Sequence, residues 1–250
     1  MPAATLPRER GMMVIWGEVQ DKSTDEEDLN EWWTYEHLPE RLAISGFRRA
    51  RRYYSVEDAK SQYLVCYEVS SVDVFTSPAY MDALNHPTPG TQRNMPLMAS
   101  MNRLVCRVGQ SCSRPEFGQF SGSGSGATIV LITFQPPASQ GQRDELGGWI
   151  AETVWPSLSS QHQSLLAIHL LQYDRYASQS GSSTKSYEKA SFQSAETPER
   201  WVILVELAES MAAPFAKHRV ITQSIVQQLK IFAGEIEARA FGLICALGQQ

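Results

Sequence analysis

The sequence predicts an α+β fold built from two tandem ferredoxin-like repeats, which together form an intramolecular pseudo-dimeric α+β barrel. Three observations carry this prediction. The same order of elements, βαββαβ, occurs twice along the 250 residues. A Gly- and Ser-rich stretch, GQSCSRPEFGQFSGSGSG, separates the two occurrences. A βαββαβ chain makes a four-stranded antiparallel sheet with both helices on one face, and a second copy in the same chain can cover the other face.

The domain boundaries follow from this pattern. We expect an N-terminal tail at 1–11, a first repeat at 12–108, a linker at 109–126 and a second, divergent repeat at 127–248. Within the second repeat, the polar segment 177–199 predicts a long mobile loop.

The first repeat shows clear strand and helix signals. Apolar and β-branched runs predict strands at 12–19, 46–54, 62–69 and 102–108. Thr24 and Glu27 have the spacing of a capping box, which begins a helix. Pro39 cannot donate to that helix and is expected to end or kink it. Ser77 caps a second helix with Pro78 at its first position, and this helix resumes after HPTPG.

The second repeat follows the same order with weaker signals. Strands are expected at 127–134, 165–173, 201–210 and 238–247, and helices at 143–155 and 214–235. Aligning Trp149 with Trp33 puts Thr153 at the position that His37 occupies in the first repeat. A site that depends on this histidine would then occur once per chain.

Composition excludes several classes of protein. Apolar residues make up 42% and charged residues 20% of the chain, which is ordinary for a globular protein. The formal charge of -5 argues against a general nucleic-acid binder. Four cysteines without a CxxC pair indicate buried thiols in a reducing compartment. We find no signal-type or membrane-spanning apolar run, and we expect a cytoplasmic protein without a membrane partner.

Three stretches resemble a known family. WWTYEHLPERLAISGFRRARRYY contains a Trp, then His-x-Pro, then Gly-Phe before an Arg-rich strand. YLVCYEVSSVDVFTSPAYMDALNHPTPGTQRNMPLM and NRLVCRV complete the pattern, with a Tyr-Leu strand that ends in Glu before SPAY. Together, over about residues 12–108, they resemble the EthD-like branch of the dimeric α+β barrel superfamily. The resemblance implies the barrel fold. The superfamily includes cofactor-free monooxygenases, polyketide cyclases, isomerases, haem enzymes and accessory proteins, so fold does not fix function.

His37 is the first candidate functional residue. It follows Trp33 by four residues and Leu29 by eight, so it shares the apolar stripe that faces the sheet. A shielded histidine near a helix end can act as a general base or acid close to neutral pH. The alternative is a hydrogen-bonded core histidine that ties the helix to a strand.

The arginines of RRARR lie on a predicted strand and therefore divide between its two faces. Alternation places Arg49 and Arg51 on one face with Phe47 and Tyr53, and Arg48 and Arg52 on the other. No continuous basic patch results, which argues against a nucleic-acid partner.

Acids near the strand ends are the expected partners of these arginines. Glu68 and Glu18 are the candidates, and strand alignment puts Glu206 opposite Glu68. One interpretation is a structural ion-pair network. The other is that Arg51 or Arg52 binds an enolate, carboxylate or phenolate group of a ligand.

Aromatic residues of the first repeat are candidate ligand contacts. Core filling is their default role, but buried hydroxyls need partners and a flat hydrophobic ligand could supply them. The candidate binding residues are Trp16, Trp33, Tyr53, Tyr63 and Phe75.

No cofactor or metal is predicted. His162, His169 and His218 show no metal-ligand spacing, and His86 is interpreted as a loop residue. The sequence has no GxGxxG, GxxxxGK or GxSxG motif. No histidine stands out as an axial ligand of haem.

The absence of cofactor motifs and the placement of His37 predict a cofactor-independent enzyme that works by proton transfer, as an isomerase, cyclase or lyase. The family resemblance, together with the predicted aromatic lining, implies that its substrate is a hydrophobic, aromatic or polyketide-like small molecule. His37 would move the proton, Tyr67 or Tyr63 would hydrogen-bond an oxyanion, and Arg52 with Glu68 would hold polar ends of the ligand or each other.

Two alternatives stay open: a cofactor-free monooxygenase that uses the same pocket, and a non-catalytic ligand-binding or accessory protein. A cavity of several hundred cubic ångströms lined by His37 and the tyrosines would favour an enzyme. The fused repeats predict a monomer with pseudo-two-fold symmetry or a weak homodimer.

Overall fold

The computed structural model describes residues 10–19, 25–55, 61–115, 126–181, 183–188 and 199–248. The strands in these ranges are β1 (Gly11–Val19), β2 (Phe47–Ser55), β3 (Gln62–Val69), β4 (Met98–Ser113), β5 (Thr128–Gln135), β6 (Leu165–Tyr173), β7 (Trp201–Leu207) and β8 (Gly234–Gly248). They are hydrogen-bonded in the order β1-β3-β2-β8-β5-β7-β6-β4 and close into a barrel. The predicted α+β barrel class is confirmed.

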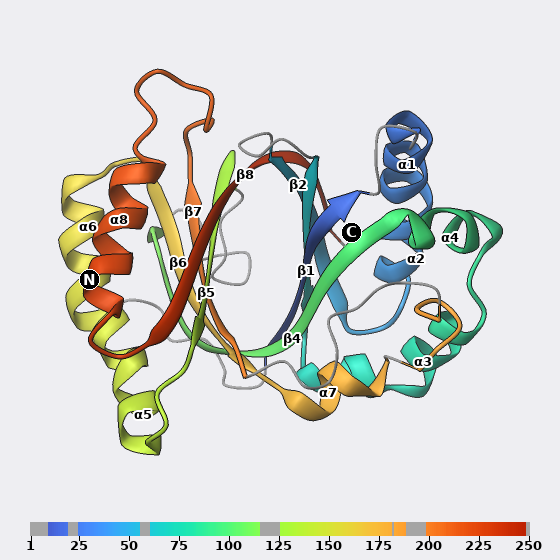
Figure 1. The fold of residues 1–250 in the computed structure, drawn as a ribbon, viewed down its shortest axis with the longest axis horizontal. Coiled ribbons are helices and arrows are strands. Elements are labelled where there is room, and N and C mark those ends of the chain that lie inside the picture. The colour runs from blue at the N-terminus through green and yellow to red at the C-terminus, as the bar shows by residue number, and fades with distance from the viewer. Residues whose placement is uncertain are drawn as a thin grey trace. The chain divides into compact units, whose positions relative to one another are not determined.

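The helical segments follow the expected order (Figure 1). The α-helices are α1 (Glu26–Trp32), α2 (Leu38–Leu42), α3 (Pro78–Asn85), α4 (Pro89–Asn94), α5 (Gln140–Trp149), α6 (Trp155–Gln161), α7 (Arg175–Ser180) and α8 (His218–Leu229). The short turns are π-helical in η1 (Trp33–His37) and η5 (Ile150–Val154), and 3-10 helical in η2 (Val72–Thr76) and η3 (Met95–Leu97). No helix in the described part of the chain is long and apolar enough to cross a membrane.

The chain divides into two compact units. The N-terminal unit holds the described residues within Glu9–Arg107, Asp174–Thr197 and Ile244–Gln250. The C-terminal unit holds those within Val108–Tyr173 and Pro198–Leu243.

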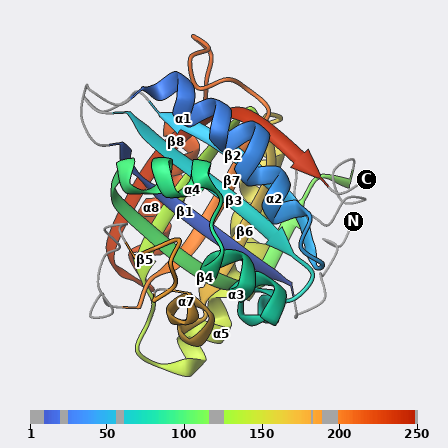
Figure 2. The same ribbon diagram turned by 90° about the vertical axis from the view of Figure 1, so that its right-hand side faces the viewer.

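In the N-terminal unit, β1 lies between β3 and β4, and β2 pairs with β3, all antiparallel. Helices α1, α2, α3 and α4 lie over one face of these strands (Figure 2). The core fills the layer between helices and sheet, with residues such as Leu29, Leu38, Phe47, Val65 and Tyr80 at most 1% exposed. Burial of these apolar side chains is the main source of stability for the layer.

In the C-terminal unit, β5 pairs with β7 and β8, and β6 pairs with β7, again antiparallel. Helices α6 and α8 lie on one face of this sheet (Figure 1). Its core includes Leu146, Ile150, Val205 and Ile225, all at most 1% exposed.

Both repeats contain the same irregularity where their second strand begins. The β2/β3 register shifts between Phe47 and Arg49, and the β6/β7 register shifts between Leu165 and Ala167. A β-bulge adds one residue, so side chains before it change face. The prediction that Phe47 shares a face with Arg49 is therefore wrong: Phe47 packs in the helix-side core, against Phe75 and Tyr80.

Several expected boundaries move. The first helix is capped by Asp25, whose carboxylate accepts from the backbone N–H groups of Glu27 and Asp28 at 3.1 Å, and Thr24 lies outside the described residues. The strand expected at 102–108 is part of β4, which runs into the first residues of the predicted linker 109–126; residues 116–125 are outside the described ranges. In place of the helix expected at 214–235, α8 is shorter and β8 has already begun at Gly234.

The segment 177–199, predicted as a long loop, begins with the end of α7, and residues 183–188 form turns that pack on the N-terminal unit. Asp174 caps α7 by accepting from the backbone N–H of Ala177 at 3.0 Å. Further along, the Ser186 N–H and hydroxyl both donate to the Leu84 carbonyl, and Tyr187 is only 6% exposed. This segment therefore contributes to the N-terminal core; residues 182 and 189–198, like residues 1–9 of the expected tail, are outside the described ranges.

On the sheet face opposite the helices, Glu68 forms a buried ion-pair cluster. Its carboxylate accepts a hydrogen bond from Arg49 at 2.8 Å, and its Oε1 forms an ion pair with Nη2 of Arg51 at 2.9 Å. Arg51 is fully buried and Glu68 is 3% exposed. The ion-pair network expected of Glu68 is present, with two of the four arginines of RRARR.

Replacing Glu68 tests how far the fold depends on this cluster. Glu68→Ala leaves the buried charge of Arg51 without this carboxylate, and we expect the free energy of unfolding in urea to fall by about 3–5 kcal/mol. The matched control is Glu237→Ala, which removes an exposed carboxylate 3.8 Å from Arg200 and changes stability by less than about 1 kcal/mol. An equal loss of unfolding free energy in Glu68→Ala and Glu237→Ala would contradict the assignment of a stabilising role to the buried cluster.

Candidate active site around His37

His37 is the last residue of the π-helical turn η1. The Leu38 N–H donates to the carbonyl of Trp33, five residues earlier, and the helix then continues as α2. Pro39 lies at the start of α2, and the end or kink expected just before it takes the form of this π-turn between α1 and α2. A π-turn takes up one extra residue, which lets the chain pass a position that has no N–H to donate.

The second repeat has the same turn. There the Trp155 N–H donates to the Ile150 carbonyl, and Pro156 follows. Because both turns precede a proline, the turn is explained by the proline. Superposing the turns places Val154 at the position of His37, so the expected equivalence with Thr153 is one residue out of register.

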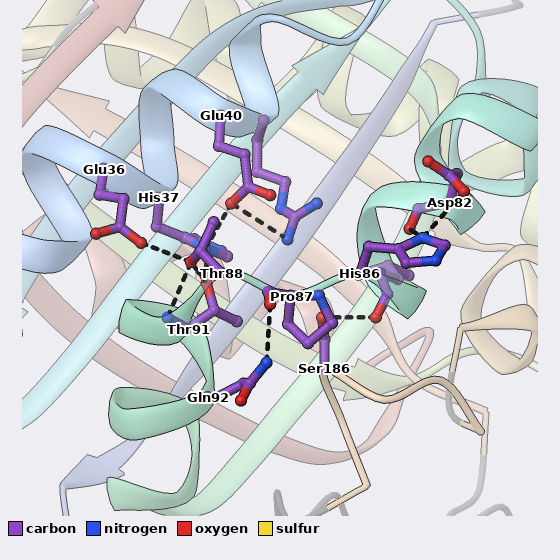
Figure 3. A network of polar contacts seen from close by, with 12 residues as sticks. Glu36, His37, Glu40, Asp82, His86, Pro87, Thr88, Thr91, Gln92 and Ser186 are labelled. Carbon is purple, nitrogen blue, oxygen red and sulfur yellow. Dashed lines mark hydrogen bonds and ion pairs between the residues drawn. The ribbon is translucent and has the colours of Figure 1, made fainter.

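The His37 ring is held on three sides. Trp32 packs against it with ring centroids 4.8 Å apart. Its Nδ1 lies 3.4 Å from the hydroxyl of Thr91 and 3.8 Å from Oε2 of Glu40 (Figure 3). Among the described residues, Nε2 has no hydrogen-bond partner. The residue is 9% exposed, so it is largely shielded from solvent and a small part of its surface remains accessible.

The hydroxyl of Thr91 belongs to a chain of polar groups that leads to the surface. Thr88 lies 3.0 Å from Thr91 and donates to Oε1 of Glu36 at 2.5 Å (Figure 3). Glu36 is exposed. The order His37, Thr91, Thr88, Glu36 therefore joins a buried imidazole to a solvent-facing carboxylate. Thr88 also caps α4 through the Thr91 N–H, which fixes this geometry.

Burial makes His37 a neutral base. It lowers the pKa of His37 well below its ordinary value, and the positive charges of Arg41 and Arg52 lower it further. At neutral pH the imidazole is uncharged and one of its nitrogens is available to accept a proton.

A cavity of about 260 Å³ borders this network. Its wall combines the end of α3 and the start of α4 with the segment before residue 189: Pro87, Thr91, Gln92, Met95, Pro96, Lys185, Ser186 and Glu188. Thr91 is the link to the histidine. Neither His37 nor a predicted tyrosine lines this cavity, so the observation that would have favoured an enzyme most strongly is met only in part.

The two candidate tyrosines have different surroundings. The Tyr63 hydroxyl donates to Glu26 at 2.8 Å and accepts from Asn30 at 3.0 Å. The Tyr67 hydroxyl is buried, with the indole N–H of Trp33 directed at it, and its own O–H donates to no acceptor among the described residues. Burial raises the pKa of Tyr67, with the charge of Arg41 acting in the opposite direction, so its phenol stays protonated as a donor.

Arg52 and Glu68 lie on opposite faces of the sheet. The Arg52 guanidinium donates to Thr34 at 2.6 Å and to Asn30 at 2.7 Å, and it stacks 4.4 Å from the Trp33 ring centroid. These contacts are all on the helix side. Glu68 pairs with other arginines on the opposite face, so the structure does not bring Arg52 and Glu68 together.

The predicted aromatic contacts divide in the same way. Trp33, Tyr63 and Phe75 are buried in the helix-side core. Trp16 and Tyr53 both pair with Leu64 on neighbouring strands, so they lie on the other face. One pocket cannot use all five side chains.

Sequence reasoning missed a second buried polar cluster, in the C-terminal unit. The hydroxyl of Ser111 lies 2.5 Å from Nδ1 of His169, and Nε2 of His169 lies 3.3 Å from Glu206. All three residues are at most 4% exposed. When β2 and β6 are aligned at their bulges, His169 takes the position of Arg51. The pair His169 and Glu206 is therefore the counterpart of the pair Arg51 and Glu68. An alignment of β2 with β6 would have found it.

Among the described residues, no group of three or more His, Cys, Asp or Glu side chains is arranged to hold a metal ion.

No family model matches the sequence, and no curated protein matches it. Solved structures are similar in fold. An anthrone oxidase-like protein has a TM-score of 0.61 at 11% identity, covering 99% of this chain and 96% of that one. A proposed monooxygenase from Fusobacterium nucleatum has a TM-score of 0.57 at 10% identity, covering 96% and 95%. A proposed chlorite dismutase has a TM-score of 0.54 at 11% identity, covering 94% and 95%. At these identities the likeness shows a shared α+β barrel fold, and membership of the dimeric α+β barrel superfamily and of its EthD-like branch stays a prediction.

The lowered pKa of His37 predicts a pH dependence of stability. In the unfolded chain the pKa of a histidine is near 6.5, so below that pH the unfolded chain binds a proton that folded His37 does not bind. The contribution of neutral His37 to the free energy of unfolding is therefore complete above about pH 6.5 and decreases as the pH falls below that value. Between about pH 5 and 6.5, the free energy of unfolding should change less steeply with pH in His37→Gln than in the wild type. We expect the two slopes to differ by up to about 1.4 kcal/mol per pH unit. His86→Gln, which changes an exposed histidine, is the control. Identical slopes in wild type and His37→Gln would contradict the burial argument.

Gly90 allows α4 to approach closely the helix that carries His37, formed by α1, η1 and α2. A Cβ atom there would lie 2.5 Å from Oε1 of Glu36 and 2.6 Å from Cδ1 of Trp32. We expect Gly90→Ala to lower the free energy of unfolding in urea by about 1–3 kcal/mol through overpacking. Gly148→Ala, in a helix with open space around it, is expected to be neutral or to stabilise by up to about 1 kcal/mol. An equal change in the free energy of unfolding for Gly90→Ala and Gly148→Ala would contradict the close packing at Gly90.

Proposed function

We propose that this protein is a cofactor-independent enzyme that transfers a proton on a hydrophobic, aromatic or polyketide-like small molecule, with His37 as general base and acid. The observation that carries the proposal is the state of His37: neutral, buried and anchored through Nδ1, with Nε2 unengaged. A core histidine that only ties elements together would be expected to use both ring nitrogens.

The reaction would begin when Nε2 removes a proton from a carbon next to a carbonyl group. The C–H electron pair becomes an enolate, and His37 becomes an imidazolium ion. Return of the proton to another carbon completes an isomerisation, whereas departure of a leaving group with the electron pair completes an elimination. The buried phenol of Tyr67 is the proposed donor to the enolate oxygen, since its raised pKa keeps it protonated.

The chain of Thr91, Thr88 and Glu36 would support the imidazolium state. Thr91 can accept a hydrogen bond from a protonated Nδ1, and Glu36 lies at the solvent end of the chain. Arg52 is proposed as a positioning residue, because its bonds to Asn30 and Thr34 hold the histidine helix against β2. Glu68, committed to its ion pairs on the other face, takes no part.

A cofactor-free monooxygenase is the second candidate. The likeness to an anthrone oxidase-like protein and to proposed monooxygenases favours it. Such chemistry would start from the same deprotonation, followed by reaction of the carbanion with O₂. The two candidates therefore share His37 and differ in whether O₂ is consumed.

Turnover of a panel of aromatic and polyketide substrates tests both candidates. Products are identified by mass in heavy water under isotopically labelled O₂, so that deuterium marks proton transfer and labelled oxygen marks oxygenation. We expect deuterium incorporation by the wild type and a loss of roughly a hundredfold to ten-thousandfold in His37→Gln.

His86→Gln is the matched control and should keep full activity, while thermal melting shows that each variant is folded. Unchanged turnover in folded His37→Gln would contradict the role of His37. Absence of both labels from every product would favour the non-catalytic binding protein.

A further inference from the structure

Arg41 is a buried cation whose hydrogen bonds are not made. Its side chain lies on the inner face of α2 and is 2% exposed. Neither Nη1 nor Nη2 has a hydrogen-bond partner among the described residues. The nearest carboxylate oxygen, Oε2 of Glu40, is 3.7 Å away and is itself without a hydrogen bond.

This arrangement is unfavourable in the unliganded protein. An arginine cannot escape burial by losing its proton, because its pKa stays above the physiological range. A buried charge without close partners destabilises a fold, and natural proteins retain such groups where function requires them. The unmade bonds of Arg41 therefore indicate a missing acceptor.

The Tyr67 hydroxyl lies in the same layer. The Arg41 guanidinium stands over the Tyr80 ring at 5.9 Å, and Phe47 packs between Tyr80 and Tyr67 at 5.6 and 6.0 Å. The indole N–H of Trp33 is directed at the Tyr67 hydroxyl, whose own O–H donates to no acceptor among the described residues. The charge of Arg41 also acts against the rise that burial causes in the pKa of Tyr67, which places the two groups close together.

A second arginine approaches from β4. Arg103 donates through Nη1 to the Ser178 carbonyl at 2.7 Å, and its guanidinium also interacts with the hydroxyl groups of Tyr80 and Tyr187. Its guanidinium stands 5.6 Å from the ring centroid of Tyr187. The positive charges of Arg103 and Arg41 both act on Tyr187, so the layer holds two cations. Among the described residues, no carboxylate forms an ion pair with Arg103.

The site lies beside the candidate base. Arg41 follows His37 by four residues, one helical turn, and is the first charged group that lowers its pKa. The 260 Å³ cavity is walled by Thr91, which contacts His37, and by Ser186, which precedes Tyr187. The cavity wall is thus connected to His37 through Thr91 and to the layer of Arg41 through Ser186 and Tyr187.

We infer that Arg41 and Tyr67 form a binding site for the carboxylate of an aromatic acid, with Arg103 adding positive charge. The two Nη atoms match the two oxygens of a planar carboxylate, and the phenol supplies a further donor. This inference rests on the proposed function for its link to catalysis: the substrate class becomes an aromatic or polyketide-like carboxylic acid, held one helical turn from His37.

Binding of 2-naphthoate, compared with the uncharged isostere 2-naphthamide, tests the site without requiring turnover. By calorimetry we expect naphthoate to bind wild type at least about tenfold more tightly than naphthamide. Arg41→Met should remove this preference, Arg41→Lys should keep part of it, and Tyr67→Phe should weaken naphthoate severalfold. Arg93→Met, which changes an exposed arginine, should leave binding unchanged. Equal binding of the acid and the amide to wild type, or full naphthoate binding by Arg41→Met, would overturn the proposal.

Thermal melting without ligand separates a binding role from a structural one. If Arg41 is kept for a ligand, Arg41→Met removes an uncompensated buried charge, and its melting temperature should equal or exceed that of wild type. A melting temperature several degrees lower would show that Arg41 supports the fold, and the inference would fail. Arg41→Lys and Tyr67→Phe keep the binding test decisive if Arg41→Met does not fold.

The outcomes also separate this inference from the proposed function. Naphthoate binding that depends on Arg41, without turnover of any acid, supports the site and contradicts the enzyme. Turnover of neutral substrates that depends on His37 and is not inhibited by naphthoate supports the enzyme and overturns the carboxylate site.

Discussion

The helix that carries His37 contains a proline in its interior, and the placement of every later side chain depends on how the helix accommodates it. An α-helical turn would leave the carbonyl opposite Pro39 without a donor and would crowd the ring against it. The π-turn from Trp33 to His37 solves both problems by adding one residue. The same turn presents His37 to Thr91 and puts Arg41 on the buried side of the next turn. A backbone constraint thus arranges the groups to which we assign chemistry.

The sheet of the N-terminal unit keeps two kinds of buried charge apart. On the face away from the helices, Oε1 of Glu68 lies 2.9 Å from Nη2 of Arg51. On the helix face, Arg52 donates to neutral oxygens and stacks on an aromatic ring, while the one carboxylate within ion-pair distance of Arg41 among the described residues is 3.7 Å away. The contrast matters because all of these are arginines buried within the same unit. His37 lies one helical turn before Arg41, on the same helix face of the sheet.

Local signals predicted the strands well and the site only in part. The strand expected at 62–69 matches β3 at both ends, because an uninterrupted apolar run is a local property. The bulge after Phe47 was hidden, since it exists only in the pairing of β2 with β3. Likewise, no spacing connects Thr91 to a histidine 54 residues away. Arg41 was overlooked because a charged residue in a helix suggests a solvated face, and burial of its guanidinium is decided by tertiary packing.

Having both repeats on one polypeptide changes what evolution can do with the barrel. In an assembly of two identical chains, any substitution appears twice, so a polar group that suits one half must be tolerated in the other. Here the matching positions of the two π-turns hold His37 and Val154, and those of the second strands hold Arg51 and His169. Each half has therefore been free to diverge alone. One half can specialise in chemistry while the other drifts toward a purely supporting role, an asymmetry that a homodimer cannot encode in its gene.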